Sequence, residues 1–207
     1  MPNKPTVVRT NSTPGSIKVV ELRALTFQEL WDNYPSGDPY DDPTGEYKNQ
    51  CAIRMSVTFH RVGSEMKSFS QKLVKPMPGK ATLGRILLDG KPTATRAYEL
   101  GEWLRLRPFG GLPNAEDITG SAWEAKVKGR TGIILFYGYW RQEGDSPDNL
   151  SGGHIDLWNG ARLTISGPID SIATISRRFG LNSFASGTPF GFSDLRQSKK
   201  ILFWEIK

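Results

Sequence analysis

The side chains that most often carry chemistry near neutral pH are scarce in this sequence, which holds one cysteine, Cys51, and two histidines, His60 and His154. When a fold brings a cysteine and a histidine together, the pair can cleave amides, because the imidazole removes the thiol proton and later protonates the leaving amine. One sulfur and two imidazoles are too few for an internal disulfide, a thiolate-rich zinc site or a three-histidine metal site. We expect neither a metal nor another cofactor.

Cys51 follows residues 35–48, whose three prolines and two glycines predict a loop. Residues 51–62 alternate as in a strand, but they also place apolar side chains on one helical face, and Asn49 as an N-cap favours the helix. A thiol at the start of a helix has a lowered pKa, because the helix dipole and the free backbone N–H groups stabilise the thiolate. The alternative is a lone cysteine that serves as a small buried hydrophobic residue.

His154 opens a predicted β-hairpin, with strands over 154–158 and 161–165 joined by the Asn159-Gly160 turn. A Gly-Gly dipeptide that ends at Gly153 precedes it and leaves room for a substrate beside the imidazole. A histidine on a sheet and a cysteine at a helix start, far apart in sequence, form the papain-type arrangement. The alternative is a strand-edge histidine whose polar atoms are merely exposed or hydrogen-bonded.

His60 is the weaker of the two histidines as a partner for Cys51. Nine residues separate the two, which on a helix is about two and a half turns, or ~13 Å along the axis. A hydrogen bond does not span that distance. We assign His60 a structural or surface role, which leaves His154 as the histidine that can serve the thiol.

The elements that must hold these residues indicate an α+β fold, an early helical half followed by a mostly antiparallel sheet. Thr26 and Glu29 fit a capping box, so a short helix should follow and end near Tyr34-Pro35. Residues 1–20 are expected to form a flexible arm ahead of a single domain over 21–207. The other expectations are loops over 76–92 and 141–153, helices over 93–106, 115–127 and 171–179, and strands over 132–140 and 200–206.

Composition bounds the classes of function. The chain has 207 residues, of which 37% are hydrophobic and 23% charged, and its formal net charge is +6. Because the basic residues are dispersed, we expect no nucleic acid partner, although a basic surface suits an acidic polymer such as a cell wall. No stretch approaches ~18 continuous apolar residues, and no apolar segment follows the N-terminus, so we expect neither a membrane span nor a secretory signal. We expect synthesis in the cytoplasm and, if the protein acts elsewhere, export without a cleaved signal.

Two segments, residues 49–56 (NQCAIRMS) and 153–160 (GHIDLWNG), resemble a known family. With the closing Phe-Trp-Glu strand they are similar, in the same order, to the fourth family of type VI secretion amidase effectors. The resemblance implies a papain-like fold related to NlpC-type cell-wall peptidases, with a helical N-terminal part packed on an antiparallel sheet. The similarity spans roughly residues 25–207, with 64–130 matched loosely.

The resemblance also implies an antibacterial activity. Family members cleave peptidoglycan stem peptides between D-glutamate and meso-diaminopimelate, at the γ-linkage, in the periplasm of a rival bacterium. The implied partners are a tube or spike component of the type VI apparatus and a cognate immunity protein, which can be dimeric. Residue by residue, Cys51 matches the nucleophile and His154 the base.

The third catalytic residue is where this chain departs from the family. The family has an aspartate eleven residues after the histidine, and this chain has Ile165 there. The predicted Asn-Gly turn also places Ile165 opposite His154, so the acceptor that orients the imidazole must come from elsewhere. Asp156 lies two residues along the same strand face, ~6.6 Å away, and Asp170 lies just past the second strand. Both aspartates remain open as the acceptor.

The oxyanion formed during amide cleavage needs hydrogen-bond donors near the thiol. We expect the backbone N–H of Cys51 and the side chain of Gln50 to supply them. Arg54 and Ser56 match the Arg-x-Ser of the family and are either structural or substrate-positioning residues. The rival hypothesis is a non-catalytic protein, a cell-wall-binding or immunity-type module, in which Cys51 is a buried structural residue.

Overall fold

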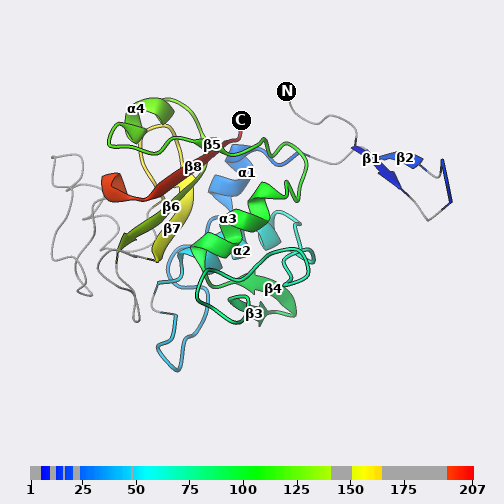
Figure 1. Cartoon of the computed structure of the whole chain (residues 1–207), viewed down its shortest axis with the longest axis horizontal. Helices are drawn as coiled ribbons and strands as arrows, with labels where there is room; N and C mark the ends of the chain where they lie inside the picture. Colours follow the sequence, from blue (N-terminus) through cyan, green and yellow to red (C-terminus); the bar gives the residue numbers. More distant parts are fainter. Residues whose placement is uncertain are drawn as a thin grey trace.

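A four-stranded antiparallel sheet with the order β5-β8-β6-β7 is the frame of the molecule (Figure 1). The computed structural model describes residues 6–9, 13–15, 17–20, 24–47, 49–140, 151–164 and 195–207. In these ranges the helices are α1 (Phe27–Asp32), α2 (Cys51–Arg61), α3 (Ala97–Arg105), α4 (Trp123–Val127) and the short η1 (Leu195–Gln197). The strands are β1 (Thr6–Arg9), β2 (Ile17–Val20), β3 (Arg85–Leu88), β4 (Lys91–Ala94), β5 (Glu116–Asp117), β6 (Gly132–Trp140), β7 (Gly152–Trp158) and β8 (Lys200–Glu205). The prediction of an α+β fold is confirmed.

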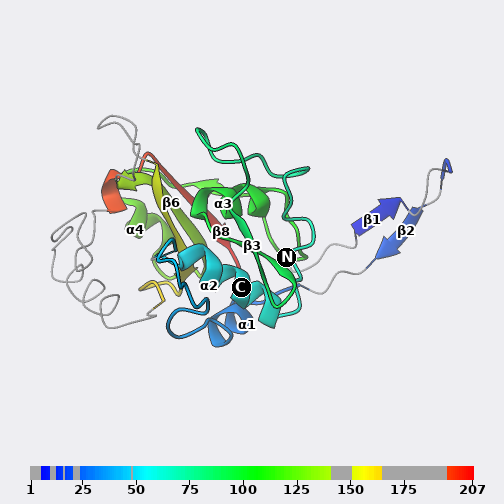
Figure 2. The same cartoon turned by 90° about the horizontal axis from the view of Figure 1, so that it is seen from below.

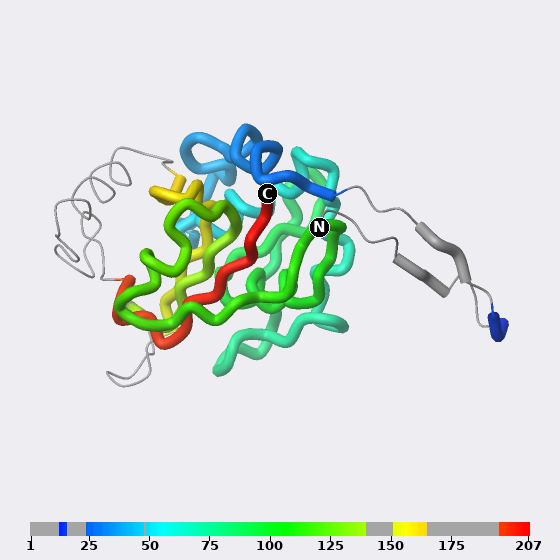
Figure 3. The backbone as a smooth tube through the Cα atoms, turned by 90° about the horizontal axis from the view of Figure 1, so that it is seen from above, coloured from blue at the N-terminus to red at the C-terminus, as the bar shows by residue number. Residues whose placement is uncertain are grey.

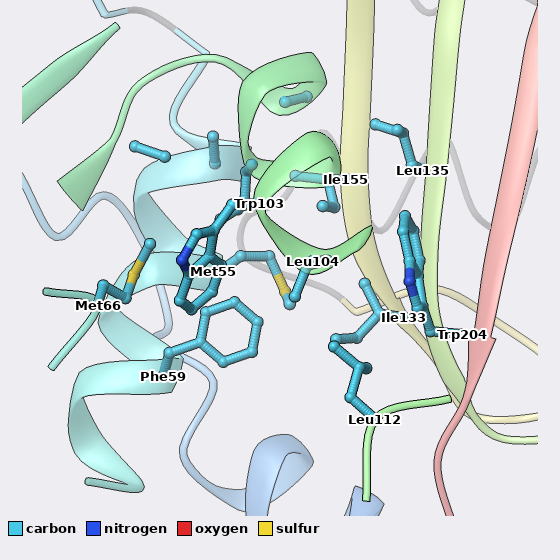
Figure 4. Close-up of a cluster of buried hydrophobic side chains, with 14 of the residues drawn as sticks. Met55, Phe59, Met66, Trp103, Leu104, Leu112, Ile133, Leu135, Ile155 and Trp204 are labelled. Carbon is cyan, nitrogen blue, oxygen red and sulfur yellow. The ribbon is translucent and has the colours of Figure 1, made fainter. Parts of the chain in front are cut away.

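The central strand β6 is buried on both faces of the sheet, as its continuous apolar run predicts. Ile133 and Leu135 point into a core shared with α2 and α3, whereas Ile134 and Phe136 point into a second core beneath α4. In the first core, shown in Figure 4, the helices contribute Met55, Phe59, Trp103 and Leu104, and the sheet contributes Ile133, Leu135, Ile155 and Trp204. This packing fixes the first turn of α2 against the sheet.

The segment that leads into α1 closes the fold beside the C-terminus, as Figure 3 shows. The backbone N–H of Phe27 donates to the carbonyl of Lys207 at 3.0 Å, and that of Leu25 donates to Gly110 at 3.3 Å. The capping box of Thr26 and Glu29 is confirmed, with both reciprocal bonds present. No helix in the described ranges is long and apolar enough to cross a bilayer.

The predicted arm over residues 1–20 contains a two-stranded antiparallel hairpin, formed by β1 and β2. Figures 1 and 2 both show this hairpin standing apart from the rest of the chain. The division into an arm and one domain over 21–207 stays a prediction. The predicted strands over 132–140 and 200–206 are confirmed as β6 and β8.

The predicted loop over 76–92 is wrong in its second half, where β3 and β4 form a hairpin. Its turn is Asp89-Gly90, with φ of 50° at the aspartate and 74° at the glycine, the positive values that a tight hairpin requires. Pro92 does not prevent the strand, because β4 belongs to a two-stranded sheet with a free edge. The predicted helix over 115–127 is also shorter than expected, because residues 116–117 form β5 and α4 begins at Trp123.

Candidate active site

The thiol of Cys51 lies at the first residue of α2, and its side chain is buried. The expected N-cap, Asn49, is wrong: Gln50 is the N-cap, and its side chain makes no capping bond. The Asn49 side chain instead accepts a bond of 3.3 Å from the backbone N–H of Cys51. Cys51 therefore occupies the first full position of the helix, at the positive end of its dipole.

The loop before α2 is tied to the first turn of the helix. The Gln50 amide bonds twice to the backbone of Tyr40: its oxygen accepts from the N–H at 3.0 Å, and its nitrogen donates to the carbonyl at 2.8 Å. Arg54 donates to the Gly37 carbonyl at 3.0 Å and pairs with Asp38 at 2.7 Å. The Gln50 nitrogen carries a second N–H, so its role as an oxyanion donor stays a prediction that uses that remaining hydrogen.

A hollow of about 510 Å³ lies beside this loop. Asp38, at its rim, is paired with Arg54, and the Asp42 carboxylate accepts from the backbone N–H groups of Glu46 at 3.1 Å and Tyr47 at 2.6 Å. These carboxylates therefore hold the loop in shape. The residues that line the hollow are Asp38, Pro39, Tyr40, Asp41, Asp42, Tyr47 and Gln50.

Two other polar side chains attach α2 to β4 and lie away from the thiol. The buried hydroxyl of Ser56 donates to the Ala52 carbonyl at 2.8 Å and accepts from the Ala94 N–H at 3.1 Å. The His60 ring bonds through Nε2 to the Pro92 carbonyl at 3.0 Å. Burial lowers the pKa of His60. Both contacts position the helix rather than the reacting groups.

His154 is held by β7, whose partner in the sheet is β6, with Phe136 opposite the histidine. The residue before it, Gly153, pairs with Tyr137, and a Cβ there would lie 3.0 Å from the Phe136 carbonyl oxygen and 3.6 Å from the Cβ of Ala97. The glycine thus permits the close approach of β7 to the Phe136 carbonyl of β6, whereas the Ala97 contact would be an ordinary one. The His154 side chain keeps 21% of its surface exposed.

The structure brings the Cys51 thiol and the His154 imidazole close enough for each to act on the pKa of the other. Burial raises the pKa of the Cys51 thiol, but the hydrogen bond and charge of His154 outweigh burial, so the pKa is lowered. Burial lowers the pKa of His154, but hydrogen bonds to Asp156 and Cys51 raise it from 6.5 to about 10. Both directions favour a thiolate beside an imidazolium, the reactive form of a nucleophilic cysteine.

Asp156 lies on β7, two residues after His154, and its carboxylate contacts the imidazole. Its Oδ2 is 3.3 Å from His154 Nε2, which leaves Nδ1 as the ring nitrogen for the thiol. Its Oδ1 accepts from the backbone N–H of Leu157 at 2.7 Å and from the hydroxyl of Thr164. The carboxylate is 3% exposed. Asp170, the other aspartate left open by the sequence, lies outside the described residues.

The predicted hairpin register after His154 is wrong. Trp158 forms an antiparallel bridge with Leu163 rather than with Ala161, and the Asn159 N–H donates to the Arg162 carbonyl at 3.1 Å. The loop therefore spans four residues instead of two. The inferred pairing of position 165 with the histidine no longer follows, and Ile165 itself lies outside the described residues.

Sequence reasoning missed two hydroxyl groups in this neighbourhood, those of Thr164 and Tyr34. Thr164 bonds to Asp156, and Tyr34 lies close enough to both for them to act on its pKa. Neither residue belongs to a recognisable motif, and the long separation between them left no spacing signal. Within the described ranges, no group of three or more histidine, cysteine, aspartate or glutamate side chains is placed to hold a metal ion.

Comparisons of sequence and of structure relate the chain to known proteins. The family model Tae4, described as "Type VI secretion system (T6SS), amidase effector protein 4", matches residues 47–204. That span includes Cys51, His154 and Asp156 and covers more than half of the chain. No curated protein sequence matches significantly.

Solved structures show the same likeness at low identity. The type VI effector Tae4 from Enterobacter cloacae superposes with a TM-score of 0.51 and 17% identity, over 90% of this chain and 99% of that chain. Salmonella typhimurium Tae4 in complex with the E. cloacae immunity protein Tai4 gives 0.49 and 16%, over 88% and 99%. The Tae4–Tai4 complex of E. cloacae gives 0.48 and 19%, over 89% and 99%. The first of these matches shows a shared fold.

Proposed function

Because this chain belongs to the type VI secretion system amidase effector protein 4 family, we propose that it is a cysteine amidase that hydrolyses peptidoglycan stem peptides. The observation that carries the proposal is the line of contacts from the Cys51 thiol through the His154 ring to the Asp156 carboxylate. A lowered thiol pKa beside a raised imidazole pKa supports the same assignment. Our proposed substrate bond is the γ-D-glutamyl–meso-diaminopimelate amide.

In the proposed reaction the Cys51 thiolate attacks the carbonyl carbon of that amide, and an Sγ–C bond forms. The C–N bond then breaks as the imidazolium of His154 gives its proton to the departing amine, which leaves a thioester. Water attacks the thioester while His154 accepts its proton. The C–S bond breaks, the carboxylic acid product is released, and the thiolate–imidazolium pair is regenerated.

We assign the imidazole-orienting role to Asp156, with support from its 3.3 Å contact to His154 Nε2. Asp156→Asn should lower hydrolysis about 10²-fold, because the amide no longer holds the imidazole in its charged form and correct orientation. Asp170→Asn is the matched comparison and should stay close to the parent. The opposite ranking of the two variants would assign the role to Asp170.

The oxyanion donors in this proposal are the backbone N–H of Cys51 and the second N–H of the Gln50 amide, with Gly153 leaving space for the substrate. The bond from the Cys51 N–H to Asn49 is 3.3 Å long, near the upper limit for N–H···O. A charged oxyanion is a stronger acceptor than a neutral amide oxygen, so it can replace Asn49.

The wider assignment follows from family membership. We propose a papain-like, NlpC-type fold over residues 21–207, behind the arm of residues 1–20. Delivery by the tube or spike of a type VI apparatus into the periplasm of a target bacterium completes the proposed path. A cognate immunity protein should block the site in the producing cell.

Digestion of purified muropeptides by the parent and by Cys51→Ala tests the proposed function. The parent should give two fragments whose masses sum to the substrate plus one water, and the variant should give none. His60→Asn serves as a matched control with an intact site. Equal digestion by the parent and Cys51→Ala would exclude the mechanism.

The burial of Cys51, at 3% exposure, favours the rival function of a binding module with a structural cysteine. Treatment of the native protein with iodoacetamide near pH 6 separates the two. An activated thiolate is modified quickly at that pH, and a neutral buried thiol is not. His154→Asn provides the control, because it removes the partner that lowers the thiol pKa.

A further inference from the structure

Near Asp156 lie two hydroxyl groups that the proposed catalytic step does not use. The Thr164 hydroxyl donates to Asp156 Oδ1, and the Tyr34 phenol lies close enough to Thr164 and Asp156 for both to act on its pKa. Tyr34 follows α1, Thr164 follows the loop after β7, and Asp156 belongs to β7. Two stretches of the chain that are far apart in sequence, Tyr34 and residues 156–164, therefore meet at one carboxylate.

The direction that a contact between the two hydroxyl groups can take follows from counting hydrogens. A threonine hydroxyl has one hydrogen, and that of Thr164 is directed at Asp156, which can only accept when ionised. Thr164 therefore has no hydrogen left for Tyr34, and Tyr34 can bond to it only as a donor. Burial and the nearby charge of Asp156 raise the pKa of Tyr34 well above its usual value, so the phenol keeps its proton.

The two carboxylate oxygens of Asp156 make different contacts. Oδ1 receives the Leu157 N–H at 2.7 Å and the Thr164 hydroxyl, whereas Oδ2 faces the His154 ring at 3.3 Å. An aspartate carboxylate rotates readily about its terminal torsion, because that torsion is broad. Two donors on Oδ1 hold the group in the one orientation that directs Oδ2 at Nε2.

Tyr34 is itself well fixed, so it can serve as an anchor. Its ring packs against the main hydrophobic core, and its backbone N–H donates to the Trp31 carbonyl at 3.3 Å. The ionisable groups that act on Tyr34 are Asp156, Arg54 and Cys51.

We propose that Thr164 and Tyr34 are positioning residues that hold the Asp156 carboxylate on His154, so that the imidazole stays aligned with the Cys51 thiol. The relevance to amide hydrolysis rests on the proposed function. Neither residue touches the reacting atoms; both act through Asp156. In this chain the aspartate that they hold lies two residues after the histidine. The position eleven residues after the histidine is Ile165.

The sign of the change in His154 distinguishes positioning from a simple electronic effect. If Thr164 only withdrew charge from the carboxylate, its removal would strengthen the Asp156–His154 bond and raise the pKa of His154. If Thr164 holds the carboxylate in place, its removal turns Oδ2 away and lowers that pKa. A general loss of packing would not change the pKa of His154 alone; it would change that of His60 as well.

The experiment is an NMR titration of the two imidazoles in the full chain, which needs no substrate. The variants are Thr164→Val, which keeps the size and removes the hydroxyl, Thr164→Ser, which restores it, and Tyr34→Phe, which keeps the ring. His60 is the internal reference, because its ring bonds to Pro92 at the other end of α2.

We expect Thr164→Val to lower the His154 midpoint by at least about one pH unit, Tyr34→Phe to lower it less, and Thr164→Ser to restore it. The His60 midpoint should not move. A His154 midpoint that is unchanged or raised in both Thr164→Val and Tyr34→Phe overturns the proposal. If Thr164→Val does not fold, the conservative variant Tyr34→Phe decides the test alone.

A second readout separates this proposal from the proposed function. On muropeptides, Thr164→Val should lower kcat about tenfold with little change in KM, since no substrate contact is removed. If the parent shows no hydrolysis, the proposed function fails, while the titration still decides whether the two hydroxyl groups position Asp156.

Discussion

A histidine lies at each end of α2, His154 of β7 at its start and His60 in its last turn. The pKa values of the two imidazoles are shifted in opposite directions. At the first residue, Cys51 meets His154, whose pKa is raised to about 10. In the last turn, His60 bonds to the Pro92 carbonyl, and its pKa is lowered. Burial lowers the pKa of both rings, so burial does not distinguish them. The neighbours do: the bonded carboxylate and thiol at His154 outweigh burial, whereas at His60 the Pro92 carbonyl and the charges of Asp89 and Glu65, opposed by Lys91, do not.

The largest test of this comparison removes each ring in turn. His154→Asn should lower kcat/KM for muropeptide hydrolysis at least about 10³-fold, because no other imidazole can take the thiol proton. His60→Asn should stay within about twofold of the parent, since its ring contacts only a structural carbonyl. Mass spectrometry of the digestion products measures both. Comparable losses in the two variants would mean that the ends of the helix are not functionally different.

The second test follows the protons directly. In the native protein the His154 ring should lose its proton near pH 10, and the His60 ring below pH 6.5, as measured by NMR. Because the folded-state pKa of His154 exceeds its unfolded value, the bound proton stabilises the fold fully below about pH 6.5. That contribution is lost as the pH rises through about 10.

The matched variant for this titration is Cys51→Ala. Removal of the thiol deletes one of the two hydrogen bonds that raise the pKa of His154, so its midpoint should fall while that of His60 stays in place. An unchanged His154 midpoint in Cys51→Ala would show that the two side chains are not coupled.

The sequence predicted the elements that carry Cys51 and His154 more successfully than the groups that surround the imidazole. Cys51 at a helix start follows from loop composition and apolar periodicity, and His154 in a strand follows from the alternating residues before Asn159-Gly160. The contact of Asp156 with the imidazole was one of two open alternatives. Its hydroxyl partners were not found, because they come from segments with no motif.

The error in the hairpin register shows why local signals are insufficient there. Asn159-Gly160 indicates a two-residue turn, but contacts far along the chain override it. The Trp158 indole donates to the Val127 carbonyl at 2.9 Å, and the Gly129 N–H donates to the Gly160 carbonyl at 2.9 Å. These bonds hold Trp158 and Gly160 against residues 127–129, and no pattern within residues 154–165 contains them. Within the loop, the Asn159 side chain also accepts from the backbone N–H groups of Ala161 and Arg162.

A third prediction concerns the middle of α2, between the two compared ends. Ser56→Ala leaves the buried N–H of Ala94 without its acceptor, so it should lower the free energy of unfolding by about 1–2 kcal/mol. The pKa of His154 and the rate of hydrolysis should be unchanged, because Ser56 bonds only to Ala52 and Ala94. Chemical denaturation measures the loss of stability. A shifted His154 midpoint would show that the attachment to β4 also sets the geometry of the site.

The smallest expected effect comes from Arg54, one turn after the thiol. Its charge contributes to the lowered pKa of Cys51, less than His154 does, and its side chain also anchors Gly37 and Asp38. Arg54→Met removes both, whereas Arg54→Lys keeps the charge but cannot reproduce the forked contacts. We expect Arg54→Met to raise the thiol pKa, read from thiolate absorbance, and to lower hydrolysis near pH 6 about threefold.

The comparison of the Arg54 variants then separates charge from anchoring. If the charge is what acts on Cys51, Arg54→Lys should keep the thiol pKa of the parent. Equal shifts in Arg54→Met and Arg54→Lys would instead assign the effect to the loop that Arg54 holds. In either case the shift should remain smaller than that of His154→Asn, because the direct hydrogen bond is the larger cause of the lowered thiol pKa. A larger shift at Arg54 would mean that the loop before α2, rather than the histidine on β7, makes this end of the helix reactive.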